Sequence, residues 1–194
     1  MVNLTGNEPF KNGHEATEFR LRDFWAWQAS DLLDNTLRGA LAEFIVAKAL
    51  GVSTAESRKD WGPYDIVYDG HHNIEVKASA YLQSWEQSKP SQIKFSIRPA
   101  REWIPKKGYT DKIIRLSDIY IFCLFTETDR EKADPLNLDQ WEFYMISTDI
   151  INEKCKEQKT ITLNSLLKLS PLKSDFSNLH ANAKRILSAM QEKP

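Results

Sequence analysis

The sequence predicts an α/β fold in which a central mixed β-sheet is flanked by helices. Three observations favour it: a helical repeat comes first, several short β-prone segments follow, and a helical repeat returns near the C-terminus. The chain has 194 residues, of which 41% are hydrophobic, so it can bury a substantial core and is not disordered as a whole. We therefore expect a single domain over residues 1–194.

This domain is expected to have three parts. Residues 1–22 are polar and rich in turn formers, which is typical of a loosely held N-terminal arm. Residues 31–146 hold the helix and the strands of the expected core, and residues 147–194 supply C-terminal helices.

The first helix is expected over residues 31–50. Apolar residues recur there every three or four positions, as one face of a helix requires, and Gly51 follows the last of them. Glycine at that place favours a helix C-terminus, because it adopts the left-handed conformation at little cost. The repeating residues are Leu33, Leu37, Leu41, Phe44 and Ile45.

The period changes after this helix. Residues 64–68 and 73–77 are short β-prone runs, joined by Asp69-Gly70-His71-His72, which favours a hairpin turn. Further strands are expected at residues 93–97, 119–125 and 141–146, and the charged, proline-containing residues 126–140 are expected to be an exposed loop. Ser147 and Thr148 could cap a short helix, and a last helix is expected over residues 176–190.

Composition excludes several classes of protein. The longest apolar run, residues 119–125, is far too short to span a membrane, and the first twenty residues lack the apolar stretch of a signal peptide. Two cysteines, Cys123 and Cys155, cannot build a disulfide framework or a cysteine-based zinc site by themselves. We therefore expect a cytoplasmic protein with no membrane partner.

Acidic side chains gather around the predicted hairpin. In its second strand Glu75 and Lys77 face one side of the sheet, and Ile74 and Val76 face the other. A turn with an odd number of residues would place Asp65 on the same face as Glu75 and Lys77. Two carboxylates and one ammonium group would then lie close together.

A divalent cation would make such a cluster less costly, because adjacent carboxylates repel on a poorly solvated sheet face. Mg²⁺ prefers oxygen ligands and commonly takes one or two protein carboxylates, and Mn²⁺ could substitute for it. A metal held there could polarise a phosphoryl oxygen and generate hydroxide. Lys77 could orient the attacking water or offset negative charge in the transition state.

Glu43, in the predicted first helix, is a candidate third carboxylate. It shares a helical stripe with small residues, which would let the helix approach a sheet closely. The alternative is that the stripe faces solvent and that Glu43 is an ordinary surface residue; the mid-helix glycine, which costs roughly 1 kcal/mol, argues against this. The stripe is Thr36, Gly39, Ala40, Glu43 and Ala47.

The acid-x-Lys triplet is not specific by itself. Two such triplets occur, Glu75-Val76-Lys77 and Glu157-Gln158-Lys159, and composition alone predicts that number by chance. The first differs in its context, because it lies in an alternating strand, follows Pro63-Tyr64-Asp65, and comes after a helix that contains Gly39-x-x-x-Glu43.

This ordered set resembles the PD-(D/E)xK nuclease superfamily, and the resemblance covers about residues 31–88. It implies a restriction-endonuclease-like three-layer sandwich and a metal-dependent DNA endonuclease of restriction or repair type. By the same resemblance, Asp65 and Glu75 would hold Mg²⁺ together with the backbone carbonyl of Val76. Lys77 would be the catalytic lysine, and Glu43 would complete the site, in part through water. Gln83 lies where some branches keep a glutamine after the lysine.

The net charge of −1 conceals a basic segment. Residues 89–115 contain eight basic and two acidic residues, a net charge of +6, and the other residues carry −7. One interpretation is a surface that follows DNA phosphates; the alternative is a solvated loop and strand edge. The residues expected to bind substrate are Gln83, Lys94, Arg98, Arg101, Lys106 and Lys107.

The expected partner is nucleic acid, most simply double-stranded DNA. Since a small domain that cuts both strands usually works in pairs, a homodimer is expected as well. The rival hypothesis is a non-catalytic module of the same fold that binds nucleic acid or a protein; it predicts Lys77 salt-bridged across a closed site. Adjacent His71 and His72 could suggest a metal pair, but turn residues are expected to point apart.

Overall fold

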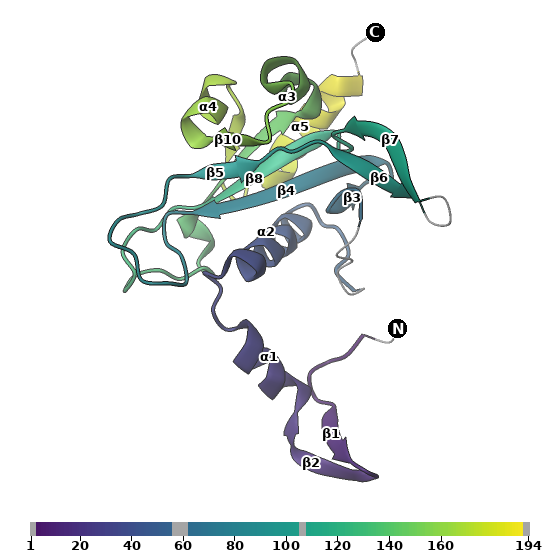
Figure 1. Ribbon diagram of the computed structural model, residues 1–194, viewed down its shortest axis with the longest axis vertical. Helices are drawn as coiled ribbons and strands as arrows, with labels where there is room; N and C mark the ends of the chain where they lie inside the picture. The colour runs from purple at the N-terminus through teal and green to yellow at the C-terminus, as the bar shows by residue number, and fades with distance from the viewer. Residues whose placement is uncertain (1–2, 56–61, 105–107, 192–194) are drawn as a thin grey trace.

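The computed structural model describes residues 3–55, 62–104 and 108–191, with only the backbone for residues 102–104. A mixed sheet of five strands forms its centre (Figure 1). The pair β4–β8 is parallel and the other pairs are antiparallel. In spatial order the strands are β11 (Leu172–Ser174), β9 (Trp141–Ser147), β8 (Ile119–Phe125), β4 (His72–Ala80) and β3 (Ile66–Tyr68).

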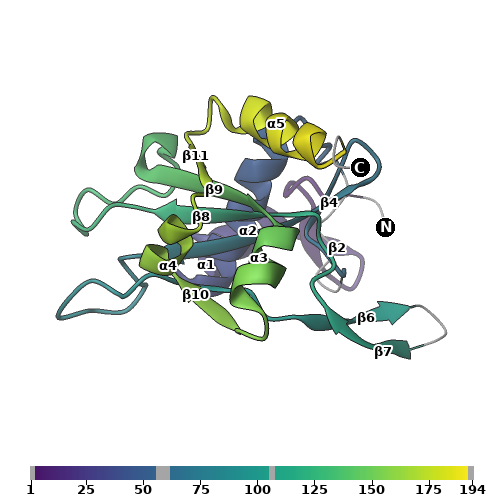
Figure 2. The ribbon, with the colours of Figure 1, turned by 90° about the horizontal axis from the view of Figure 1, so that it is seen from above.

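Both faces of the sheet are covered, which agrees with the expected mixed α/β fold and is compatible with a three-layer sandwich. On one face the core is built from α2 (Asn35–Ala49) and α5 (Leu179–Gln191). Figure 2 shows the helices along the sheet from above. The elements on the other face are α3 (Thr148–Cys155), α4 (Leu163–Lys168), β5 (Lys94–Ser96) and β10 (Thr160–Thr162).

The strand β8 occupies the middle of the core. All seven of its residues are buried, because it pairs on both edges and is covered on both faces. Its continuous apolar sequence is therefore typical of a central strand with a parallel neighbour. The prediction of a strand over residues 119–125 is confirmed to the residue.

The predicted first helix is confirmed, with a later start. Asp34 is the N-cap of α2, and its carboxylate accepts hydrogen bonds from the backbone N–H groups of Thr36 and Leu37. The helix ends at Ala49 before Gly51, whose φ of +71° is the left-handed conformation expected there.

The predicted hairpin forms from β3 and β4. Tyr68 pairs with His72, so three residues make the turn, and two of them, Asp69 and Gly70, have positive φ. The turn therefore has the odd number of residues that the placement of Asp65 beside Glu75 requires.

The N-terminal arm, residues 1–22, contains secondary structure that the sequence did not predict. It contains a hairpin, β1 (Pro9–Asn12) and β2 (Glu15–Arg20), followed by α1 (Leu21–Ala29), and it extends away from the sheet (Figure 1). The tight turn at Gly13, with φ of +62°, allows the hairpin. The helix α1 that follows the hairpin has no buried residue.

Several short elements were not predicted. A second two-stranded ribbon, β6 (Ala100–Ile104) and β7 (Gly108–Ile114), lies within the basic segment, and β10, α4 and β11 are too short for a reliable sequence pattern. Residues 126–140 form the expected loop, with a short 3₁₀ helix at Leu138–Gln140. Ser147 is at the N-cap of α3, but its side chain makes no capping hydrogen bond.

No helix in the described part of the chain is both long and apolar enough to cross a membrane.

Candidate active site

Asp65, Glu75 and Lys77 lie in direct contact. The Lys77 Nζ is 2.5 Å from the Glu75 Oε1 and 3.6 Å from the Asp65 Oδ2. The three side chains are 27% exposed for Lys77 and 21% for each acid, so the cluster is half-buried and still open to solvent. The structure thus brings together the three residues that an odd-numbered turn was expected to place on one face.

Asp65 lies where the pairing of β3 with β4 ends. Its backbone N–H donates to the carbonyl of Ile74, and its Oδ2 accepts from the Val76 N–H at 2.8 Å. Because β3 pairing stops at Ile66, the edge of β4 beyond Ile74 is open on this side. The N–H and C=O of one strand residue point to the same side, so the Val76 carbonyl faces this open edge beside Asp65.

Burial and neighbouring charges shift the pKa values of Glu75 and Lys77. Desolvation raises the pKa of Glu75, and although Lys77 lowers it, the negative charges of Asp65 and Glu43 raise it further. Desolvation lowers the pKa of Lys77, but the two carboxylates outweigh this and the pKa is raised overall. The lysine is therefore held protonated, and ionisation of Glu75 is less favourable in the folded protein than in water.

Tyr120 belongs to this cluster and was not predicted. In the parallel pairing of β4 with β8 it is the partner of Glu75, and it is only 3% exposed. Burial, followed by the charge of Glu75, raises its pKa to about 12, so the hydroxyl stays protonated. Sequence spacing could not identify it, because the register between two strands over 40 residues apart is set by tertiary packing.

Glu43 lies on α2, the helix that packs beside β4, and it is partly buried. Its charge reaches the cluster, since it raises the pKa of Glu75. The expectation that a small residue at position 39 serves close packing was wrong: a Cβ placed at Gly39 would meet nothing within 4 Å, so packing does not require glycine there.

The two strand carboxylates and the open edge beside Val76 fit a hard cation that takes few protein ligands. The raised pKa of Glu75 supports this fit, because Lys77 alone does not offset the cost of ionising a desolvated carboxylate. Among the described residues, no three His, Cys, Asp or Glu side chains lie close enough to form a metal-binding group. Any metal here would therefore rely on two acids, a backbone carbonyl and water.

The residues expected to bind substrate fall into three groups. Lys94, Arg98 and Arg101 are exposed. Gln83 is 7% exposed, and its amide donates to the Ala80 carbonyl, so its part in substrate binding stays a prediction. Lys106 and Lys107 lie outside the described residues.

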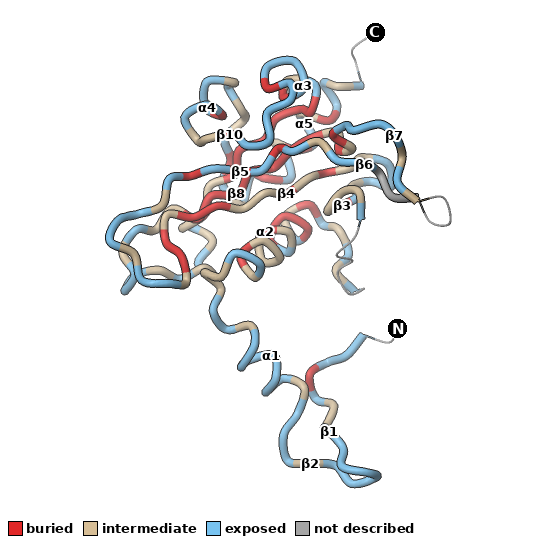
Figure 3. Tube along the Cα trace, viewed as in Figure 1, coloured by how far each residue is buried: buried red, intermediate tan, exposed pale blue. Residues whose placement is uncertain are grey.

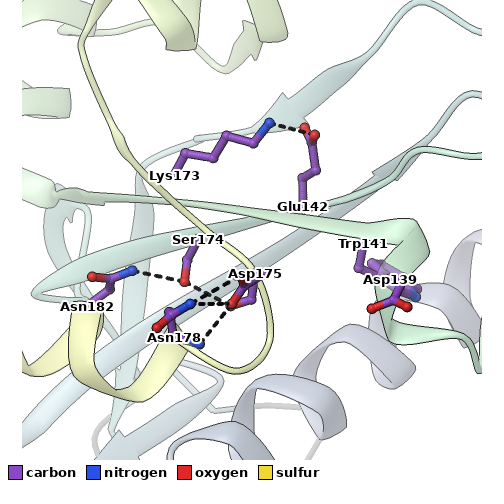
Figure 4. A pocket seen from close by; sticks show the side chains of 8 residues that line it. All are labelled: Asp139, Trp141, Glu142, Lys173, Ser174, Asp175, Asn178 and Asn182. Carbon is purple, nitrogen blue, oxygen red and sulfur yellow. Dashed lines mark hydrogen bonds and ion pairs between the residues drawn. The ribbon is translucent and has the colours of Figure 1, made fainter.

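A cavity of about 510 Å³ lies away from this cluster, at the junction of β9, β11 and α5 (Figure 4). Its polar side chains are bonded to one another: Lys173 pairs with Glu142 at 2.6 Å, and Asp175 accepts from the Asn178 backbone at 2.9 Å. Because these groups satisfy each other, we interpret the cavity as a structural junction. The remaining lining residues are Asp139, Trp141, Ser174 and Asn182.

The expectation that His71 and His72 point apart was wrong. Their ring centroids are 4.1 Å apart, and the Nε2 of each faces the amide nitrogen of Gln191, at 3.5 Å and 3.1 Å. The contact holds the end of α5 against the β3–β4 turn.

Replacing Glu75 by glutamine is expected to stabilise the fold at neutral pH. A group whose pKa is raised on folding contributes stability below its unfolded pKa and loses it as pH rises, so the ionised Glu75 is unfavourable at pH 7. We expect a gain of about 1 kcal/mol, or about 2–4 °C in Tm, which shrinks as the pH falls through the range where Glu75 protonates.

Thermal unfolding of Glu75→Gln in EDTA, from neutral to acidic pH, measures this gain. The matched control is Glu142→Gln: desolvation raises the pKa of Glu142, but Lys173 and Tyr144 lower it overall, so that change should not stabilise at pH 7. A Glu75→Gln protein less stable than the wild type at pH 7 would contradict the prediction.

Fold and site together define a class: an α/β protein with a half-buried carboxylate–lysine cluster of the kind expected for a nuclease. Residues 15–165 match the family model of bacteriophage T4 endonuclease IV, and no curated protein gives a significant match. The match covers more than half of the chain, which therefore belongs to the bacteriophage T4 endonuclease IV family. The protein is accordingly an endonuclease that acts on DNA.

Proposed function

We propose that the protein is an Mg²⁺-dependent DNA endonuclease of the PD-(D/E)xK type, with a restriction-endonuclease-like sandwich over the single domain 1–194. The observation that carries the proposal is the contact of Asp65, Glu75 and Lys77 in one half-buried cluster beside the open edge of β4. The endonuclease family match supports the reaction class.

In this proposal Asp65, Glu75 and the Val76 carbonyl hold the metal, and Glu43 completes the site in part through water. The metal, Mg²⁺ or in its place Mn²⁺, would supply Lewis-acid chemistry: polarisation of the phosphoryl oxygen and a more acidic water. The hydrogen bond from the Val76 N–H fixes the Asp65 carboxylate, so this ligand needs no reorganisation when substrate binds.

Lys77 acts as the catalytic lysine. Its Nζ lies between the two carboxylates and is protonated at neutral pH, because both acids raise its pKa above the lowering by desolvation. From this position it can orient the attacking water and donate to the phosphate oxygen on which negative charge develops. The adjacent Tyr120 hydroxyl is protonated too, so it can donate but cannot act as a base at neutral pH.

The substrate is proposed to be double-stranded DNA, held by the exposed basic residues after the catalytic strand, and the protein is proposed to work in the cytoplasm as a homodimer. The exposure of Lys94, Arg98 and Arg101 supports phosphate contacts. The proposed binding set also includes Gln83, Lys106 and Lys107.

The second candidate is a non-catalytic DNA-binding module of the same fold. The ion pair between Lys77 and Glu75 favours it, because this pair neutralises part of the cluster without a metal. The partial exposure of all three side chains argues against it, since the site is not closed.

Cleavage of plasmid DNA is expected in Mg²⁺ or Mn²⁺ and not in EDTA, and Asp65→Ala is expected to lower the rate at least about a hundredfold, because a metal ligand is removed. The measurement is the decrease of supercoiled plasmid with time. Asp129→Ala, which removes an exposed acid paired with Lys132, is the matched control and should cleave like the wild type. Full activity in EDTA, or in Asp65→Ala, would refute the metal site.

A further inference from the structure

The hairpin β1–β2 and the helix α1 form one ordered unit, residues 3–29, which we call the N-terminal unit. The Leu21 N–H donates to the Glu8 carbonyl at 2.9 Å, so the start of α1 is tied to the segment before β1. The unit extends from the side of the body that carries α2, and most of it is exposed (Figures 1 and 3). Its residues belong to neither hydrophobic core cluster of the body.

Aromatic side chains make the surface of the N-terminal unit apolar. On α1, Trp27 is 81% exposed and Phe24 is 44% exposed, and their ring centroids lie 6.4 Å apart on one face of the helix. On the hairpin, the exposed rings of Phe10 and Phe19 are 4.9 Å apart. A helix of nine residues and an isolated hairpin are each marginal in water by themselves. This surface therefore indicates a partner that covers it.

The charge of the N-terminal unit favours a protein as this partner over a polyanion. The unit contains three basic and four acidic residues, a net charge of −1. Binding of a phosphate backbone requires an excess of Lys and Arg, which is absent from this unit. Exposed aromatic residues are instead typical of the buried centre of a protein–protein interface.

The surface area of the chain is larger than that of a compact monomer. Its accessible surface is 13025 Å² for a mass of 22.4 kDa. A folded monomer of this mass exposes roughly 9,400 Å², so the chain has an excess of about 3,600 Å². Stable homodimers bury about 1,000–2,500 Å² of each partner. The excess is therefore enough for a stable dimer contact.

The outer side of α2 carries an apolar surface that complements the N-terminal unit. Leu37, Leu41 and Phe44 follow one another there at steps of four and three, and Phe44 is 50% exposed. A twofold interface requires both complementary surfaces on the same chain, because each copy presents one surface to the other. The aromatic face of α1 and the outer side of α2 meet this requirement.

The connection between α1 and α2 directs α1 away from its own α2. The N–H groups of Leu32 and Asp34 each donate to a carbonyl of the connection, at 3.1 Å. The buried guanidinium of Arg38 donates to the Leu33 carbonyl at 2.8 Å, which fixes the connection to the body. As a result α1 extends away from the body (Figure 1). An element that does not cover the apolar face of its own chain is free to cover that of a second copy.

We propose that the N-terminal unit is the dimer contact of this protein: the aromatic face of α1 packs on the outer side of α2 of a second copy, and the reverse contact forms across the twofold axis. The inference rests on the proposed function only in that cutting both strands of DNA needs two active sites. Since α2 also carries Glu43, the contact fixes the two candidate active sites relative to each other.

The test is the mass of the protein in solution, measured without DNA and in EDTA. Light scattering after gel filtration, at about 1–100 µM protein, should give twice the 22.4 kDa of one chain for the wild type. Phe24→Ala/Trp27→Ala should raise the dissociation constant of the dimer at least about tenfold, because interface aromatics contribute most of the binding energy. Phe44→Ala, on the opposite surface of the contact, should weaken the dimer as well.

The matched control is Tyr109→Ala/Ile113→Ala, which removes two exposed apolar side chains from β7 and should leave the dimer intact. A wild type that is monomeric throughout this range would overturn the proposal, as would equal dissociation constants for the α1 variant and the β7 variant. A monomer that loses affinity for DNA in the α1 variant would assign the unit to DNA instead. A dimer that depends on α1 but never cuts plasmid would support the contact and reject the proposed function.

Discussion

Replacing Lys77 by alanine is expected to lower the rate of DNA cleavage by about a hundredfold to a thousandfold, the usual effect of removing one preorganised donor from a developing negative charge. Lys77 forms ion pairs with both Asp65 and Glu75. Its removal takes away the donor for the phosphate oxygen and leaves two partly buried carboxylates that repel each other.

Single-turnover cleavage of labelled DNA, at saturating protein and in Mg²⁺, measures this effect on the chemical step. Lys173→Ala is the matched control: Lys173 also forms an ion pair, with Glu142 at 2.6 Å, but outside the cluster, and its removal should leave the rate unchanged. Thermal unfolding run in parallel establishes that the Lys77→Ala protein is folded at the assay temperature. Wild-type cleavage by folded Lys77→Ala would reject the lysine as a catalytic residue.

Arg115→Ala is expected to cause the largest decrease in stability, about 3–5 kcal/mol, because it removes a buried guanidinium with four hydrogen bonds and leaves one buried and three partly buried acceptors without their donor. The acceptors are the carbonyls of Ile97, Lys156 and Gln158, together with the side chain of Asn152. For a chain of this length the change corresponds to a decrease in Tm of roughly 6–20 °C.

Thermal and denaturant unfolding measure the change. Arg98→Ala is the control, since Arg98 is exposed near the same end of the ribbon and its removal should alter stability by less than about 0.5 kcal/mol. Arg115→Lys should recover only part of the stability, because an ammonium group does not reproduce the guanidinium fork. A Tm for Arg115→Ala within the range of the Arg98→Ala control would show that the hydrogen bonds of Arg115 are not needed for stability.

Local sequence patterns were sufficient for the elements that define the core. The apolar period and the glycine that follows it identified α2, and the unbroken apolar run identified β8. Both succeeded because the physical cause is local: a helix repeats every 3.6 residues, and a strand buried on both faces is apolar throughout.

These sequence patterns did not predict the secondary structure of the β6–β7 ribbon or of the N-terminal arm. The strand β7 is largely exposed and α1 has no buried residue. An element without a buried face lacks the alternation of apolar and polar residues from which a strand or helix is predicted. The buried position of Arg115 was not expected either, because a charge count treats every arginine as solvated. This guanidinium donates to the backbone carbonyls of Ile97, Lys156 and Gln158, which come from two segments of the chain.

What the sequence by itself determined is the alternation along β4, which places Glu75 and Lys77 on one face because side-chain direction in a strand has a period of two. The sequence placed Asp65 on that face only for a turn with an odd number of residues, and the structure supplies that turn. What only the tertiary structure decided is the surroundings of that hairpin. The parallel register that places Tyr120 beside Glu75, and the hydrogen bond from Arg115 to the carbonyl of Ile97, join segments distant in the chain. Such contacts depend on packing, which no short stretch of sequence contains.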